Sequence, residues 1–285
     1  MIDLGTGPAI VLIPGLQGRW EWMRPAVHAL ATRARVISFS LPGEPGSDRP
    51  FGGSACFDCF PAQIDAALDR AHVAGAVMCG VSFGGLIALR YAATRPDRTR
   101  ALVLVSTPGP HWKPSRAARR CMTHPRLRFP EFCVGAGRRA WRELRGTFPN
   151  WRQRVQAAIR YAGLILAAPA APSRMSHRAR LALGTNFEED CARVDAPTLI
   201  VTGEPGMDHV VPTGTTLEYG RLIRGAHVVR LDGTGHLGLI TRPDRFAEVI
   251  ADFASAHSEA PAAAAKRPQA QPGPERRRRA TSGFL

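Results

Sequence analysis

A serine flanked by glycines is the residue of this sequence with the clearest chemical meaning. Segment 76–94, AVMCGVSFGGLIALRYAAT, places Ser82 in the pattern Gly80-Val81-Ser82-Phe83-Gly84, which has the form G-x-S-x-G. An apolar run precedes this pattern and a helix-compatible segment follows it. When a strand turns sharply into a helix, small neighbours expose the serine hydroxyl above the sheet, and the helix N-terminus faces it. The pattern therefore predicts a nucleophile, against the alternative of a glycine-rich turn with an incidental serine.

A serine hydroxyl becomes a good nucleophile only when a base accepts its proton and a carboxylate holds that base in place. For a serine in this pattern, the expected chain order is serine, then acid, then histidine. His236 follows the last apolar run in GTGHLG, and Asp208 follows the run before it in EPGMDHVVP. Glu204 is the alternative acid, and His209 is expected to have at most a supporting role. We therefore predict the triad Ser82, Asp208 and His236.

The elements that must position these residues are apolar runs alternating with helix-compatible segments. Strands are expected at 9–13, 35–40, 75–80, 101–107, 197–203 and 227–233, and helices at 21–32, 61–72, 84–94, 213–223 and 242–256. This alternation is typical of an α/β fold with a doubly wound, mostly parallel sheet covered by helices on both faces. Such folds place their sites at the carboxyl ends of the strands, where all three predicted residues would then lie.

The charge distribution divides the chain into three parts. The total net charge is +15, but residues 108–184 hold sixteen Lys or Arg and two acidic residues, a balance of +14. We expect a core formed by 1–107 and 191–257, a helical insert at 108–190, and a basic tail at 258–285. The basic insert could attract an anionic substrate, bind weakly to an anionic lipid surface or partner, or simply be a solvated face. Its aromatic residues are expected to pack mainly within the insert: Trp112, Trp141, Phe148, Trp151 and Tyr161.

The remaining features limit the function classes. No segment approaches the ~20 apolar residues that a membrane span needs, and no secretory signal is recognisable at the N-terminus. Six scattered cysteines favour reduced thiols and a cytoplasmic location, and the isolated pair Cys56 and Cys59 is weak evidence for a metal or redox site. The tail, rich in Ala, Pro and Arg, is predicted to be disordered, and dedicated nucleic-acid binding is not expected. The sequence predicts no metal or organic cofactor, and it leaves the oligomeric state open.

These residues and motifs resemble the α/β-hydrolase superfamily, in the branch that carries an inserted cap. The resemblance covers roughly residues 8–256: VLIPGLQG resembles the family's oxyanion turn, GVSFGG the nucleophile elbow, GEPGMDHVVP the acid loop and GTGHLG the histidine loop. It implies that the backbone N–H groups of Leu16 and Phe83 form the oxyanion hole. Because the chain begins close to the strand at 9–13, the resemblance also implies a sheet shortened at one edge.

The identity of the nucleophile narrows the expected chemistry. Relatives that use an aspartate at the elbow open epoxides or displace halides, whereas serine points to acyl transfer to water. The resemblance implies a serine hydrolase acting on a small carboxylic ester or related acyl compound. The alternatives with the same triad are hydrolysis of a carbon–carbon bond, opening of a lactone, and acyl transfer to another acceptor. A non-catalytic small-molecule receptor on the same fold is the alternative from another class.

Overall fold

A seven-stranded sheet forms the centre of the molecule in the computed structural model, which describes residues 1–50 and 57–258. The strand order is β1-β3-β2-β4-β5-β6-β7, and every neighbouring pair is parallel except β1 and β3. The strands are β1 (Ile2–Leu4), β2 (Ala9–Ile13), β3 (Arg35–Ser38), β4 (Ala76–Val81), β5 (Thr99–Val105), β6 (Thr198–Thr202) and β7 (His227–Arg230). The expected α/β fold with a mostly parallel, doubly wound sheet is confirmed.

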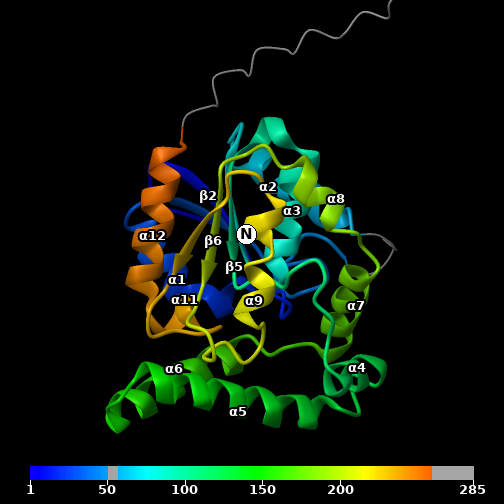
Figure 1. The fold of residues 1–285 in the computed structure, drawn as a ribbon, viewed down its shortest axis with the longest axis vertical. Helices are drawn as coiled ribbons and strands as arrows, with labels where there is room; N and C mark the ends of the chain where they lie inside the picture. The colour runs from blue at the N-terminus through cyan, green and yellow to red at the C-terminus, as the bar shows by residue number, and fades with distance from the viewer. Residues whose placement is uncertain (51–56, 259–285) are drawn as a thin grey trace, which may run out of the picture.

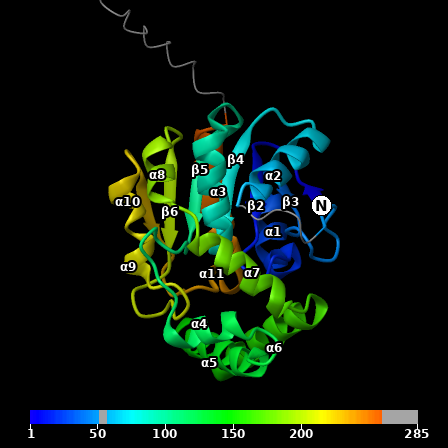
Figure 2. The same ribbon diagram turned by 90° about the vertical axis from the view of Figure 1, so that its right-hand side faces the viewer.

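Helices cover both faces of this sheet, as Figures 1 and 2 show. One face packs against α2 (Cys59–Arg70), α3 (Phe83–Thr94), α8 (Glu188–Arg193) and α10 (Tyr219–Leu222), and the other against α1 (Arg24–Ala31), α11 (Gly238–Thr241) and α12 (Pro243–Ala256). Alternate strand residues enter the two layers: Val11 and Ile13 face the first, Ile10 and Leu12 the second. Because both faces are buried, the central strands are continuously apolar.

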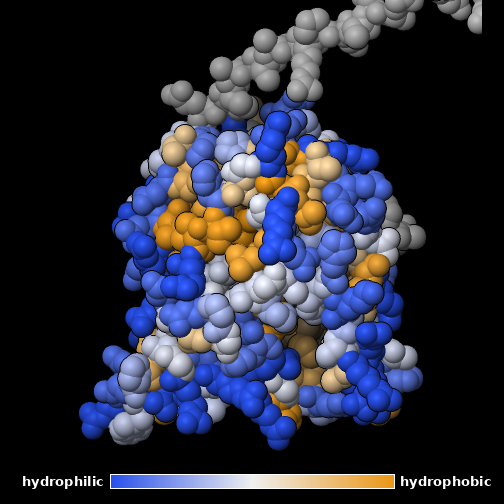
Figure 3. Space-filling view, in the orientation of Figure 1, coloured by the Kyte–Doolittle hydropathy of each residue, from blue (hydrophilic) through white to orange (hydrophobic). Residues whose placement is uncertain are grey.

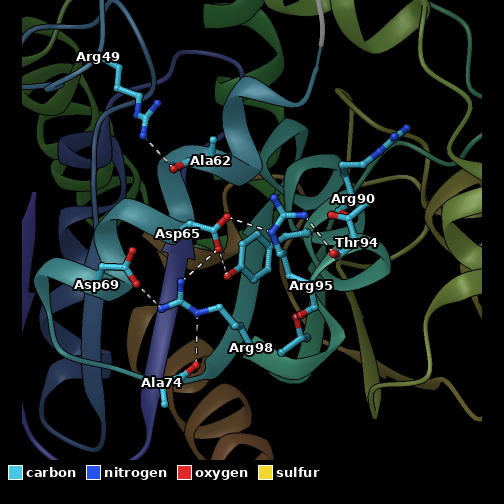
Figure 4. Close-up of polar contacts among 11 residues, drawn as sticks. Arg49, Ala62, Asp65, Asp69, Ala74, Arg90, Thr94, Arg95 and Arg98 are labelled. Carbon is cyan, nitrogen blue, oxygen red and sulfur yellow. Dashed lines mark hydrogen bonds and ion pairs between the residues drawn. The ribbon is translucent and has the colours of Figure 1, made fainter.

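Helix α3, which follows Ser82, is fixed to α2 by a cluster of charged and polar side chains near its C-terminus (Figure 4). Asp65 of α2 accepts hydrogen bonds from the Tyr91 hydroxyl at 2.9 Å, from Arg95 Nε at 3.1 Å and from Arg98 Nη1 at 3.3 Å. Arg98 Nη2 also donates to Asp69 at 2.7 Å. Shared by three donors, the Asp65 carboxylate connects both helices to the short 3-10 helix η2 (Pro96–Arg98) at the end opposite the predicted site.

The long connection between β5 and β6 carries the insert helices, the name used here for α4 to α7. They are α4 (Arg116–Thr123), α5 (Phe129–Thr147), α6 (Trp151–Ala167) and α7 (Pro172–Leu183). In both ribbon views α4, α5 and α6 form a layer beyond the end of the sheet near which α11 lies. Trp22 of η1 (Trp20–Met23) donates from its indole N–H to the Ala168 carbonyl at 2.7 Å, which ties the C-terminal end of α6 to the core.

Three details differ from the sequence-based expectations. The three-residue strand β1 is not predicted, because such a short segment carries no usable periodicity, and it extends the sheet beyond β3. The helix expected at 213–223 is two short helices, α9 (Thr213–Thr216) and α10. The expected boundary at 190/191 falls within α8, which packs against α3 of the core. Across residues 1–50 and 57–258, no helix is both long and apolar enough to span a membrane.

Candidate active site

Ser82 occupies a strained turn between β4 and α3. Its backbone has φ 54° and ψ −119°, a conformation that side-chain-bearing residues rarely adopt. The turn is possible because its neighbours lack side chains: a Cβ on Gly80 would overlap the Gly84 carbonyl, and a Cβ on Gly85 would overlap the Thr107 side chain. The sequence pattern of Ser82 thus corresponds to a sharp strand-to-helix turn, and such strain persists where the surroundings over-determine it.

The predicted oxyanion turn lies directly beside this serine. Gly15 and Gly18 close a tight turn through an N–H···O bond of 2.9 Å, and a Cβ placed on Gly15 would lie 3.6 Å from the Ser82 Cβ. Leu16 stands within this turn, and Phe83 is the first residue of α3. The two predicted backbone donors therefore belong to segments on either side of the Ser82 turn. Their role as donors stays a prediction.

An arginine from the insert braces the predicted oxyanion turn, and the sequence analysis did not identify it. Arg178 of α7 is 1% exposed, and its Nη1 donates to the Leu16 carbonyl at 3.1 Å and to the Gln17 carbonyl at 3.3 Å. Its Nη2 donates to Glu44 at 2.8 Å, and Glu44 also pairs with Arg174. Only a residue without a Cβ fits at position 18, since any side chain there would meet the Arg178 guanidinium.

Asp208 and His236 are hydrogen-bonded to each other. His236 Nδ1 lies 2.9 Å from Asp208 Oδ2, and the two side chains are 13% and 1% exposed. Asp208 follows β6 and His236 follows β7, so the carboxyl ends of adjacent parallel strands bring them together. Asp208 Oδ1 accepts the N–H groups of Val210 and Val211 at 2.9 and 2.8 Å, which fixes the carboxylate.

The charges of this pair support each other. Burial opposes ionisation of Asp208, but the His236 ring and the two backbone donors outweigh it, and the pKa of the carboxyl is lowered. Burial likewise opposes the charged imidazole, but Asp208 and Glu143 raise the pKa of His236 above its ordinary value. An ionised carboxylate only accepts hydrogen bonds, so Nδ1 carries the proton and Nε2 is left as the basic nitrogen.

The alternative acid Glu204 has a different set of partners. Its Oε1 accepts the Gly233 N–H at 2.6 Å, and its own N–H donates to the Thr234 carbonyl at 2.8 Å. Glu204 therefore ties the acid loop to the start of the histidine loop. His209 adjoins Asp208 in the chain and is partly buried.

A second residue that the sequence analysis missed is Glu143 of α5. It is 3% exposed, and its Oε1 accepts the N–H groups of Gly235 and Leu237, the two neighbours of His236. The available signal was weak: Glu143 is one of only two acidic residues in the strongly basic segment 108–184.

The insert is more exposed than the sequence suggested. Trp141 and Trp151 are 43% and 65% exposed, so these two do not form an interior of the insert. Tyr161 packs edge-on against Trp22 of the core, with ring centroids 6.1 Å apart. Hydrophilic side chains dominate the insert surface in Figure 3, and the surface is hollowed between insert and core, with hydrophobic colour inside the hollow.

Other possible sites are less well formed. Within the described ranges, no group of three or more His, Cys, Asp or Glu side chains could hold a metal ion. Cys59 begins α2, whereas Cys56 lies outside the described residues, as does most of the basic tail. A cavity of about 390 Å³ lined by Phe39, Ser40, Gln63 and further residues contains no member of the predicted triad. Within the described residues, the strand-end loops that carry Ser82, Asp208 and His236 therefore remain the candidate site.

Comparison with known proteins assigns the chain to a family. The family model for the alpha/beta hydrolase fold matches residues 8–243. Polyketide synthase ThaQ of Burkholderia thailandensis is 31% identical over 87% of this chain, and the match spans 12% of ThaQ. The pimeloyl-[acyl-carrier protein] methyl ester esterase of Xanthomonas campestris pv. campestris is 26% identical over 89% of this chain and 97% of its own length.

A solved structure shows the same fold. The enol-lactonase from Burkholderia xenovorans LB400 superposes with a TM-score of 0.71 at 22% identity, covering 88% of this chain and 94% of the enol-lactonase. This chain belongs to the alpha/beta hydrolase family. Relatives matched over nearly their whole length are named as esterases, and this chain is an alpha/beta hydrolase enzyme.

Proposed function

We propose that this protein is a serine hydrolase that cleaves small carboxylic esters through an acyl-enzyme intermediate. The proposal rests on one observation above others. A histidine held by a buried carboxylate at 2.9 Å lies in the loop after β7, at the same sheet edge as a serine in a strained strand-to-helix turn. In this proposal Ser82 is the nucleophile, His236 the general base and Asp208 the residue that orients it.

The reaction proceeds in two halves. In the first, the Ser82 Oγ attacks the ester carbonyl carbon while its proton passes to Nε2 of His236. His236 then returns this proton to the leaving alcohol, and an acyl ester on Ser82 remains. In the second half, His236 accepts a proton from water, the hydroxide attacks the acyl carbon, and the carboxylic acid leaves as Ser82 recovers its proton.

The negative oxygen of each tetrahedral intermediate needs fixed donors. We assign this role to the backbone N–H groups of Leu16 and Phe83, aided by the field at the N-terminus of α3. A preorganised donor of this kind contributes ~3 to 4 kcal/mol to transition-state stabilisation. Arg178 supports the assignment, because a buried guanidinium that binds the Leu16 and Gln17 carbonyls holds the first donor segment in one conformation.

The insert helices are proposed to act as a cap over this site. They belong to residues 108–190, the segment expected to form a separate helical unit, and α4, α5 and α6 lie beyond the strand ends (Figures 1 and 2). Hydrophobic residues lie inside the hollow between insert and core, and such a surface suits the acyl or alkyl part of an ester (Figure 3).

A fluorophosphonate probe together with p-nitrophenyl esters of increasing chain length tests this function. The wild-type protein should be labelled and should hydrolyse at least the short esters, whereas Ser82→Ala should lose labelling and on the order of 10⁴-fold or more in turnover. Ser255→Ala, a serine on the exposed side of α12, is the matched control and should behave like wild type. Undiminished turnover in Ser82→Ala would exclude the proposed nucleophile.

A further inference from the structure

Glu143 is a buried carboxylate at the junction between the insert and the core. It lies on α5, close to the end of a 19-residue helix whose surface is otherwise rich in arginine. The only other acidic residue of segment 108–184 is Glu131, whose side chain is 42% exposed. Burying one carboxylate at 3% exposure is costly unless that carboxylate has specific partners.

The partners of Glu143 lie on both sides of the proposed base. Its Oε1 accepts the Gly235 N–H at 2.8 Å and the Leu237 N–H at 2.7 Å. The contact is close, because a Cβ on Gly235 would lie 2.8 Å from the Glu143 Cδ and would also overlap the Met207 carbonyl. One oxygen atom thus fixes the two peptide groups that flank His236 and limits the directions in which its ring can point.

The same end of α5 makes further contacts with the core. Arg242 Nη2 donates to the Thr147 carbonyl at 3.3 Å, and the Arg242 guanidinium lies 5.5 Å from the centre of the Phe148 ring. A Cβ on Gly146 would lie 2.7 Å from the Met207 Cε, in the acid loop. Segment 143–148 is therefore seated on the loops that carry Asp208 and His236.

Four charged or titratable groups surround this carboxylate. Burial raises the pKa of Glu143 to about 7, against the lowering effect of its two backbone donors and of His236, and Asp208 raises it further. Arg139 of the same helix and Tyr161 of α6 also belong to this set. The charge of Arg139 lowers the pKa of both His236 and Tyr161, and the charge of Glu143 raises the pKa of Tyr161. The negative charge of Glu143 in turn raises the pKa of His236.

We propose that Glu143 is a positioning residue for His236, through which the seating of α5 on the core controls the geometry of the triad. This inference rests on the proposed function, because it assigns His236 the role of general base. The insert then does more than cover the substrate. When α5 is seated, Oε1 holds the histidine loop, and when α5 moves away, Gly235 and Leu237 lose their acceptor and the His236 ring loses a fixed direction.

Three variants test this proposal. Glu143→Ala removes the acceptor, Glu143→Gln keeps an acceptor oxygen but removes the charge, and Glu131→Ala removes the exposed carboxylate of the same helix as a control. We expect Glu143→Ala to lower kcat on the order of 10-fold to 100-fold with little change in KM for a short p-nitrophenyl ester, because the base is misplaced rather than the substrate. Glu143→Gln should restore most of kcat, and Glu131→Ala should match wild type.

Two further measurements separate positioning from a purely structural role. In Glu143→Gln the acid limb of the kcat/KM profile should move to lower pH, because the charge that raises the pKa of His236 is gone. The far-downfield proton resonance of His236 Nδ1–H should be sharp in wild type and in Glu143→Gln, and should broaden in Glu143→Ala as the loop loosens. Thermal melting establishes that each variant is folded.

The proposal is overturned by any of three results: wild-type kcat in a folded Glu143→Ala, equal impairment of the Ala and Gln variants, or an unchanged His236 resonance in Glu143→Ala. These results are distinct from a failure of the proposed function. If Ser82→Ala remained active, the hydrolase mechanism would fall, whereas the resonance of His236 would still report whether Glu143 holds its loop.

Discussion

Replacing Glu143 with glutamine should make the stability of this protein less sensitive to pH. The native-state pKa of Glu143 is about 7, and its ordinary value is 4.5. The folded protein therefore binds the proton more tightly than the unfolded chain does. Between these two pH values the native state holds more protons, so the free energy of unfolding of the wild type falls as pH rises. Above pH ~7 this loss is complete, because the buried carboxylate is then ionised in both states.

The magnitude follows from the size of the shift. A shift of one pKa unit corresponds to about 1.4 kcal/mol, so the full loss is roughly 3 kcal/mol, of which about 2 to 3 kcal/mol falls between pH 5 and pH 8. Glutamine keeps the acceptor oxygen and does not ionise. The difference in unfolding free energy, Glu143→Gln minus wild type, should therefore increase by about 2 to 3 kcal/mol from pH 5 to pH 8, whatever constant cost the substitution carries.

Urea unfolding followed by circular dichroism at pH 5, 6, 7 and 8 measures this difference. Glu131→Gln on the exposed part of α5 serves as the matched control, because it shows what the removal of an exposed carboxylate, ion-paired with Arg128, does on the same helix. A difference between Glu143→Gln and wild type that stays constant with pH, or that shrinks as pH rises, would refute the reasoning about burial.

The remaining predictions concern the proposed reaction. Asp208→Asn should lower kcat by on the order of 10⁴-fold, because His236 then loses the acceptor that fixes its tautomer. Glu204→Gln should lower kcat much less, because Glu204 only braces the histidine loop. If kcat were lower in Glu204→Gln than in Asp208→Asn, Glu204 would be the acid. The kcat/KM profile should rise with pH, and the midpoint of this rise should lie above the ordinary histidine pKa of ~6.5, because the base must be neutral and the pKa of His236 is raised. A midpoint clearly below that value would contradict the assigned base. Arg178→Met should destabilise the fold by ~3 to 5 kcal/mol, because it removes a buried partner of Glu44. It should also lower kcat for esters, because the predicted oxyanion turn loosens. Urea unfolding measures the first effect and steady-state kinetics the second, and an unchanged kcat in the folded variant would exclude the bracing role.

The sequence alone determined the fold class and the candidate residues of the site. Continuous apolar runs such as 9–13 and 101–107 identify strands buried on both faces, because only strands covered by helices on both sides lack polar alternation. The positions of Ser82, Asp208 and His236 followed from local rules: each comes shortly after such a run, and parallel strands end at one edge of a sheet. The glycines around Ser82 carried the same information, since the turn they permit is a local backbone property.

The tertiary structure alone revealed which side chains hold these residues in place. Glu143 is 92 residues before Gly235 in the chain, and Arg178 is 162 residues after Leu16, so neither contact leaves a periodicity or spacing in the sequence. Both arginine and glutamate are typical of exposed helix faces, and nothing local distinguishes the buried Arg178 from the many solvated arginines of the insert. The exposure of Trp151 reversed an expectation for the same reason. Burial depends on which surfaces meet when the insert packs on the core, and that packing is a property of the whole fold rather than of any single segment.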